Sequence, residues 1–152
     1  MGTDIGTLVT DAGTIITLEL KKFSRELIDF NKTRVLTNER ASELLQKQFY
    51  VALGPHAFNM LEAREHDVIE VQNAILKVML ESETRHLSPG DYAPLSRDLR
   101  ENAVVTSDVD DGYIAMPIKI REALKMEYLL GRRLMFQIVP NKGLYLVGFR
   151  MQ

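Results

Sequence analysis

The chain has neither cysteine nor tryptophan among its 152 residues. Without cysteine it can form no disulfide, no thiolate metal site and no cysteine nucleophile. It also lacks an apolar run long enough to cross a bilayer, and its first residues show no basic region followed by an apolar core. These absences predict a cytoplasmic protein that has no secretory signal and is not inserted in a membrane.

The glycine-rich and serine motifs of common enzyme classes are missing as well. We find no Gly-x-Gly-x-x-Gly pattern, no phosphate-binding loop and no Gly-x-Ser-x-Gly elbow. The acids at Asp108, Asp110 and Asp111 lack the terminal glutamate of a calcium loop, and a turn before Gly112 explains them without an ion. The sequence therefore predicts a non-enzymatic protein without a cofactor.

One group of metal-binding residue types deserves separate consideration. Glu62, His66 and Glu70 stand four residues apart, which would place them on one face of a helix. A metal site would need a further ligand from another helix, and the Glu-x-x-His spacing of di-iron bundles is absent. We expect no metal site.

The residues that are present have the proportions of a globular protein. Hydrophobic residues make up 45% and charged residues 26%, and the net charge is −2. The charge is uneven, because residues 1–87 carry 10 Lys and Arg against 13 Asp and Glu, whereas residues 112–152 carry seven bases and two acids. Basic charge is therefore concentrated towards the C-terminus.

The first 30 residues show a helical pattern. Apolar residues recur at steps of three and four, close to a heptad, which predicts an amphipathic helix able to pair with another. The positions are Ile5, Val9, Ala12, Ile16, Leu20, Phe23, Leu27 and Phe30. The β-branched run Thr14–Thr17 leaves a short strand as an alternative there.

Two further helices are expected before residue 88. Thr37-Asn38-Glu39 is a helix start signal, and the stripe that follows continues to the interruption at Gly54-Pro55. A third periodic segment runs from about His56 to His86 and ends before the turn at 88–91. We therefore predict an antiparallel bundle of about three helices over residues 1–87, which oligomerises or binds a partner.

The pattern changes after a predicted linker at residues 88–103. Residues 104–152 are expected to form a small β-rich module, so that the fold class is α+β. Tyr113–Met116 reads as a strand stopped by Pro117, and Ile118–Met126 has helical spacing. Two apolar runs around the turn Pro140–Gly143 predict a β-hairpin over residues 134–149.

The segment Val105–Met126 and the hairpin after it together resemble the AbrB/MazE/SpoVT family of swapped-hairpin DNA-binding domains. The family order of turn glycine, strand, proline, short helix and second glycine is matched by Gly112, Ile114, Pro117, Ile120-Arg-Glu-Ala-Leu124 and Gly131. The likeness covers about 45 of the 152 residues. The chain departs from the family at Tyr113, where an arginine is frequent, in the longer apolar segment 127–130, and in the C-terminal place of the module.

The resemblance implies an interlocked homodimer, or a higher homo-oligomer, whose paired basic surface grips duplex DNA. By carry-over, Lys119, Arg121 and Lys125 would contact phosphates. Arg132 and Arg133 are further candidate phosphate contacts, chosen for their positive charge and not from the resemblance. For Arg121 the alternative is a solvated helix face, and for Arg132 and Arg133 a charged strand edge that discourages pairing.

The function expected from the sequence is a dimeric DNA-binding transcription regulator with a partner site on its N-terminal helices. The alternative is an assembly subunit of a larger complex, such as a replication or virion assembly, docking through its helices and β-module. An enzyme that uses carboxylates on the helices ranks behind both.

Overall fold

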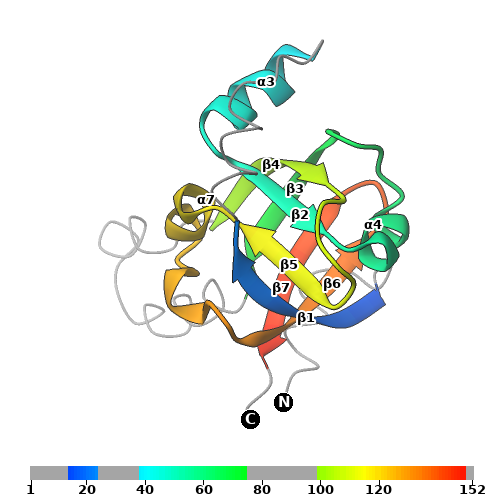
Figure 1. Ribbon diagram of the computed structural model, residues 1–152, viewed down its shortest axis with the longest axis vertical. Helices are drawn as coiled ribbons and strands as arrows, with labels where there is room; N and C mark the ends of the chain where they lie inside the picture. Colours follow the sequence, from blue (N-terminus) through cyan, green and yellow to red (C-terminus); the bar gives the residue numbers. More distant parts are fainter. Residues whose placement is uncertain (1–13, 24–37, 75–98, 150–152) are drawn as a thin grey trace, which may run out of the picture.

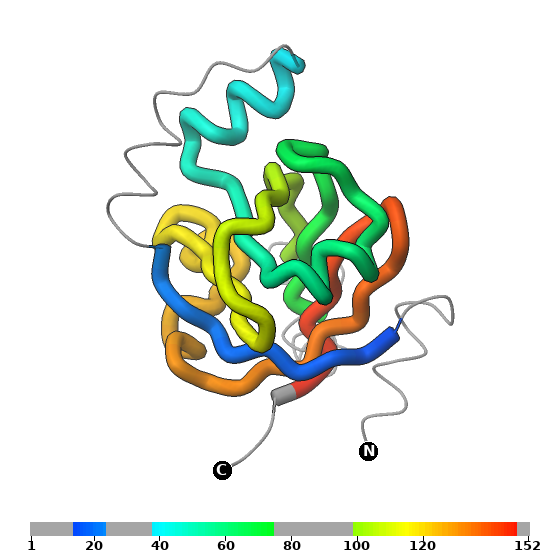
Figure 2. The backbone as a smooth tube through the Cα atoms, turned by 45° about the vertical axis from the view of Figure 1, so that its right-hand side comes forward, coloured from blue at the N-terminus to red at the C-terminus, as the bar shows by residue number. Residues whose placement is uncertain are grey.

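The computed structural model describes residues 14–23, 38–74 and 99–149 of the chain. Their strands are β1 (Thr14–Lys22), β2 (Tyr50–Leu53), β3 (Val68–Asn73), β4 (Arg100–Thr106), β5 (Tyr113–Met116), β6 (Arg133–Val139) and β7 (Gly143–Phe149). The short helices are α3 (Glu39–Gln46), α4 (Pro55–Leu61) and α7 (Ile118–Ala123), with one 3-10 turn, η1 (Glu127–Leu129). The strands close into a barrel in the order β1-β5-β2-β4-β3-β7-β6 (Figures 1 and 2).

The barrel is filled by apolar side chains that alternate along its strands. On β1, Leu18 and Leu20 are buried, whereas Lys21 is exposed. The same alternation on β6 places Leu134, Phe136 and Ile138 in the core. Each such side chain stabilises the fold by roughly 1.5–3 kcal/mol relative to exposure, so the interior of the barrel is the main source of stability.

Two halves of the chain repeat one arrangement and exchange strands. The order β1, β2, α4, β3 in the first half corresponds to β4, β5, α7, β6 in the second. Each opening strand pairs in parallel with the other half, β1 with β5 and β4 with β2. The strands β2 and β5 meet antiparallel at the centre, with Ala52 opposite Ala115. The two halves are thus interlocked around an approximate two-fold axis.

The repeat is visible in the residues as well. Tyr50-Val-Ala-Leu53 and Tyr113-Ile-Ala-Met116 are the two central strands, and a proline follows each within two residues. Proline at this place suits the start of α4, where its missing N–H needs no partner. The strand β7 has no counterpart in the first half and lies between β3 and β6.

A second apolar layer covers the outside of the barrel at α3. Asn38 caps this helix, because its Oδ1 accepts from the Ala41 N–H at 3.0 Å. The helix buries Leu44 and Leu45 in a cluster that includes Tyr50. The helix start predicted at residues 37–39 is confirmed at Asn38, and the hairpin predicted over residues 134–149 is confirmed by the pairing of β6 with β7.

The fold-class prediction is wrong, and so is the description of the chain as a helical bundle. The described residues 14–23 and 38–74 do not form helices alone but supply three barrel strands, β1, β2 and β3. These strands pair with β4, β5, β6 and β7 from the C-terminal part, and β4 begins at Arg100, inside the predicted linker. The chain is a closed barrel with short helices rather than a bundle followed by a β-module.

The error over residues 14–22 has a simple cause. Ile16 and Leu20 are four residues apart, and four is close to one helical turn but also two full strand repeats. Leu18 lies between them and belongs to the strand pattern only. The β-branched residues of Thr14–Thr17 favoured the strand that had been the alternative, and that alternative is correct.

The second and third predicted helices also stop early. The helix from residue 39 ends at Gln46, and Tyr50–Leu53 is buried on both faces, as a central strand is. The helix after Gly54 ends at Leu61, and Val68–Asn73 alternates between half-buried and buried residues. The predicted helical positions before residue 14, at 24–37 and at 75–86 lie outside the described residues, as do 88–98 of the linker and Arg150. Among the described residues, no helix is long and apolar enough to cross a membrane.

Candidate binding surfaces

The barrel carries a different surface at each end. Because β2 and β5 run antiparallel, the helices that follow them, α4 and α7, lie at opposite ends of the barrel (Figure 1). Six acids and Arg64 lie in the two loops at the α4 end: Glu62, Glu65, Asp67, Asp108, Asp110 and Asp111. The α7 end carries Lys119, Lys125, Arg132 and Arg133, all exposed.

The acidic loops are held tightly against each other. Asp111 Oδ1 accepts from the His56 N–H at 2.8 Å, which satisfies a free amide in the first turn of α4. Glu65 Oε1 accepts from both the backbone N–H and the hydroxyl of Ser107, at 2.6 and 2.8 Å. A Cβ on Gly54 would lie 2.6 Å from Asp111 Cα. The acids at this end are therefore set in fixed positions.

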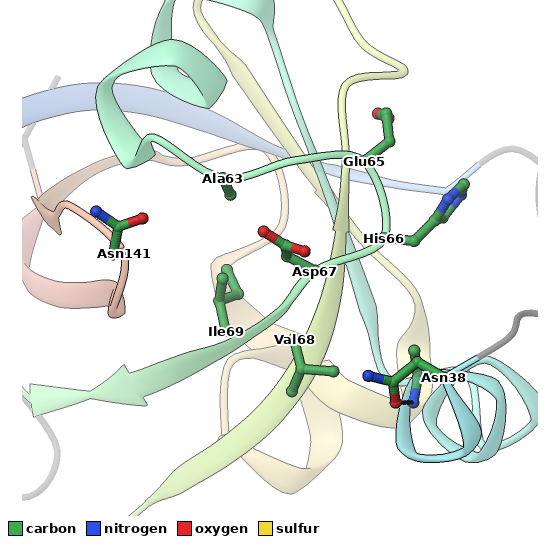
Figure 3. Close-up of a pocket in the computed structure, with 9 residues that line it drawn as sticks. Asn38, Ala63, Glu65, His66, Asp67, Val68, Ile69 and Asn141 are labelled. Carbon is green, nitrogen blue, oxygen red and sulfur yellow. Dashed lines mark hydrogen bonds between the residues drawn. The ribbon is translucent and has the colours of Figure 1, made fainter.

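A pocket of about 510 Å³ opens beside the loop at residues 62–67. Asp67 points into its centre, and the Asn141 amide lies at one side (Figure 3). Ala63, Val68 and Ile69 provide its apolar lining. The pocket thus combines a negative charge and an amide with an apolar floor.

Backbone hydrogen bonds hold the walls of this pocket. The His66 N–H donates to Val105 O at 2.8 Å, and the Val105 N–H donates to Asp67 O at 3.0 Å. Asn141 adopts a left-handed conformation with φ 61°, and its N–H donates to Leu61 O at 2.8 Å. These bonds connect the β6–β7 turn to the end of α4 and the loop at residues 62–67 to β4, so the backbone around the pocket is held together.

The pocket suits a cationic or amide-bearing group of a ligand better than a metal ion. In the described ranges no group of three or more histidine or acidic side chains could hold a metal. The residues Glu62, His66 and Glu70 do not share a helix, because Glu62 follows α4, His66 lies in the loop and Glu70 lies on β3. A buried carboxylate or histidine pair suited to acid–base chemistry is also not found among the residues that line the pocket.

The opposite end presents what we call the α7–η1 surface, meaning the exposed side chains from Ile118 to Arg133. Ile118, Tyr128 and Leu130 are 42%, 64% and 41% exposed. They belong to the four exposed large hydrophobic residues of the described chain, and the fourth is Ile15. Exposed apolar side chains that share a segment with charged ones are found at interaction surfaces, and Ile118, Tyr128 and Leu130 share theirs with exposed bases.

The structure does not bring all five predicted DNA contacts to this surface. Arg121 is 7% exposed, and its Nε donates to Met116 O at 3.0 Å inside the helix–strand junction. Burial lowers the pKa of Arg121, an effect that Glu122 and Glu127 oppose. Arg121 therefore braces the end of β5 rather than facing a ligand.

The other four bases are accessible, but acids accompany them. Glu122 and Glu127 are exposed on the same segment, and Arg133 stands opposite Glu19 in the β1–β6 ladder. Lys21 and Lys22 line a separate groove with Asp108 and Asp110. The DNA-binding and transcription-regulation assignments gain no support from this mixture of charges.

Sequence reasoning missed Asp67 and Asn141 as pocket residues. Asn141 was read only as part of a hairpin turn, and Asp67 stood inside a segment expected to be helical. Tyr128 was noted in the apolar departure at residues 127–130, which was the one available signal for the α7–η1 surface. No known protein family, curated protein or solved structure matches this chain.

Proposed function

We propose that the chain is a non-enzymatic assembly protein whose copies associate through the α7–η1 surface. The observation that carries the proposal is that three of the four exposed large hydrophobic residues of the described chain, Ile118, Tyr128 and Leu130, lie on this one segment. Contacts of this kind are used in protein interfaces, where tyrosine and arginine are enriched and a few residues supply most of the affinity.

The segment is also held in place before any partner binds. The Met126 N–H donates to Arg121 O at 2.7 Å, and the Leu129 N–H donates to Met126 O at 3.0 Å. The Gly131 N–H donates to Leu20 O at 2.8 Å, which fixes the segment to β1. A surface that is ordered in advance loses less conformational entropy on association.

An interlocked arrangement already exists within one chain. In the swapped-hairpin resemblance a second copy completes the small module, whereas here β1, β2 and β3 share a barrel with the C-terminal strands. Association therefore has no need to complete the fold and is free to use outer surfaces. Membership of the AbrB-like family stays a prediction, as does the cytoplasmic location inferred from the absence of cysteine.

The test is sedimentation equilibrium of the full chain over a range of concentrations. Wild-type protein is expected to associate, and the double variant Tyr128→Ser/Leu130→Ser is expected to remain monomeric. The matched control is Ile15→Ser, which removes an equally exposed residue from the opposite end of the barrel and should associate as wild type does. A wild-type chain that stays monomeric throughout the range would overturn the proposal.

The same samples separate this proposal from the DNA-binding alternative. A duplex is titrated into the chain at low and at moderate salt, with Arg132→Gln/Arg133→Gln beside the wild type. We expect no binding to duplex DNA. Salt-sensitive binding that the arginine variant abolishes, with no self-association, would favour the regulator instead.

A further inference from the structure

From the two ends of the barrel we infer that the α7–η1 surface of one copy docks into the acidic pocket of the next, so that copies join head to tail. The occupant of the pocket is therefore a second copy of this chain. The inference rests on the proposed function and names the surface against which the α7–η1 segment packs. It concerns the pocket lined by Asp67 and Asn141.

The two surfaces have matching chemistry. The α7–η1 segment presents Arg132 and Arg133 beside the apolar Leu130. The pocket presents Asp67 at its centre, with the apolar Ala63 and Ile69 beside it (Figure 3). A guanidinium and a carboxylate form hydrogen bonds strengthened by charge, and an apolar side chain beside them excludes water from the contact.

The pocket can receive an exposed side chain. The pocket is a concave site supported by the β6–β7 turn and the 62–67 loop, and its backbone is held by the bond from Asn141 N–H to Leu61 O. The α7–η1 segment contains exposed side chains such as Tyr128, which is 64% exposed and projects from a short 3-10 turn. A protruding segment of one copy can enter the depression of another.

The α7–η1 surface is poorly suited to pack against itself. Its four exposed bases outnumber the exposed Glu122 and Glu127, so a contact of this surface with itself brings together two surfaces of net positive charge, which opposes association. The loops at residues 62–67 and 108–111 have the same difficulty with the opposite sign, since their six acids outnumber Arg64 and the lysines near them, which are Lys142 beside the pocket and Lys21 and Lys22 in the groove with Asp108 and Asp110. Contact between unlike ends relieves both repulsions.

The positions of the two surfaces determine what the assembly looks like. They lie at opposite ends of the barrel, because α4 and α7 follow antiparallel strands. A contact between unlike surfaces leaves one of each free on every pair, so further copies add in the same direction. The assembly is then a ring or an open row rather than a closed dimer.

The experiment uses two variants of the full chain, each with one damaged surface. Glu65→Gln/Asp67→Asn removes two charges from the pocket and keeps oxygen acceptors for Ser107 and for the Arg64 N–H. Tyr128→Ser/Leu130→Ser removes the apolar part of the α7–η1 surface. Asp108→Asn/Asp110→Asn is the matched control, because it removes two charges at the same end from residues that do not line the pocket.

Each damaged variant alone is expected to weaken association by about ten-fold or more, as loss of central interface contacts does. An equimolar mixture of the two retains one intact pocket and one intact α7–η1 surface, on different chains. It should therefore form a one-to-one dimer and nothing larger, measured by sedimentation. The control should associate as wild type does, and added salt should weaken every contact.

Three outcomes would overturn the inference. If the pocket variant assembles as wild type while the α7–η1 variant does not, the proposed function stands and the head-to-tail contact fails. A mixture that remains monomeric, or a wild type that stops at a closed dimer, also contradicts it. If wild-type protein never associates, the inference and the proposed function fail together. Circular dichroism of each variant confirms that it is folded.

Discussion

The two interlocked halves of the barrel have the same order of elements but finish their central strands differently. After β2 the chain passes through Gly54 into α4, whose first turn is capped by Asp111 from the other half. After β5 it passes through Pro117, which makes no side-chain cap bond, into α7 and on through η1 with Tyr128 and Leu130 exposed. One end is closed by tight internal contacts, and the other offers side chains outward.

The difference shows that two halves with the same order of strands and helices can carry different side chains on their outer loops and helices. The interior of both halves must fill one barrel, so the strands Tyr50–Leu53 and Tyr113–Met116 remain alike. The loops and helices outside the barrel are under no such constraint, and they have acquired opposite charge. A molecule with unlike ends is suited to directional contacts with its neighbours.

The largest expected effect compares two glycines, one at each end. In Gly54→Ala the new Cβ would lie 2.6 Å from Asp111 Cα and 2.7 Å from Asp110 O, which are backbone atoms. We expect a loss of about 3 kcal/mol or more in the free energy of unfolding, measured by denaturant titration. Gly131→Ala at φ +83° has open space around it, so only backbone strain of about 1 kcal/mol is expected. Equal losses of unfolding free energy in the two variants would contradict the claim that Gly54 is tightly packed and Gly131 is not.

The second prediction concerns two cations on α7. Arg121→Met removes the donor to Met116 O at a buried site. We expect it to lower the free energy of unfolding by about 2 kcal/mol. Lys119→Met on the same helix is exposed and should change stability by less than about 0.5 kcal/mol. Thermal unfolding of both variants provides the measurement. An Arg121 variant as stable as wild type would show that the guanidinium does not brace β5.

The third prediction tests β7, the strand with no counterpart in the first half. Tyr145 OH donates to Glu70 Oε1 at 3.0 Å, and burial together with this bond raises the pKa of Tyr145 above its ordinary 10.0. Above pH 10 the unfolded chain therefore loses this proton before the folded chain does, so the free energy of unfolding falls as the pH rises.

Tyr145→Phe removes this contribution and the hydrogen bond. We expect it to lower stability by about 1 kcal/mol at pH 7 and to make the decline above pH 10 shallower than in wild type. Denaturant titrations at pH 7 to 11 measure both effects. Tyr128→Phe, which also removes one hydroxyl but at an exposed site, is the control and should match wild type at pH 7. A decline of the same steepness in Tyr145→Phe would contradict the assignment.

The smallest effect is expected at the cap of α4. Asp111→Ala removes the acceptor of the His56 N–H, and we expect a loss of about 0.5–1 kcal/mol. Asp111→Asn keeps an oxygen at the same place and should recover most of that loss. The comparison is made by thermal unfolding. If both variants lose the same stability, the charge rather than the hydrogen bond supports the loop.

Elements specified by neighbouring residues could be predicted from the sequence. Asn38 caps the helix that begins at Glu39, Pro117 ends a strand, and the turn at 140–143 joins two apolar runs. The turn chemistry of asparagine, proline and glycine acts over a few bonds and needs no tertiary context. For the same reason the strand over Tyr113–Met116 and the helix after it were predicted close to their bounds.

Strands that depend on distant partners were missed. Val68 and Val71 have helical spacing, but Ile69 and Val71 are the pair buried in the barrel, and only pairing with β4 and β7 decides between the two patterns. The pocket was missed for the same reason. Asp67 and Asn141 are 74 positions apart in the sequence and line one cavity because α4, β3 and the hairpin turn meet there.

The sequence by itself determined the features that depend on neighbouring residues, which are the cap at Asn38, the turns and the C-terminal hairpin. It also determined the uneven distribution of charge along the chain. Only the tertiary structure decided that residues 14–22, 50–53 and 68–73 are strands, that Arg121 is buried, and that the acids of residues 62–67 and the bases of residues 119–133 lie towards opposite ends of the barrel. The physical reason is that backbone hydrogen bonds between strands join residues far apart in the sequence, so the choice of strand over helix depends on the partner. Local propensity alone does not contain that information.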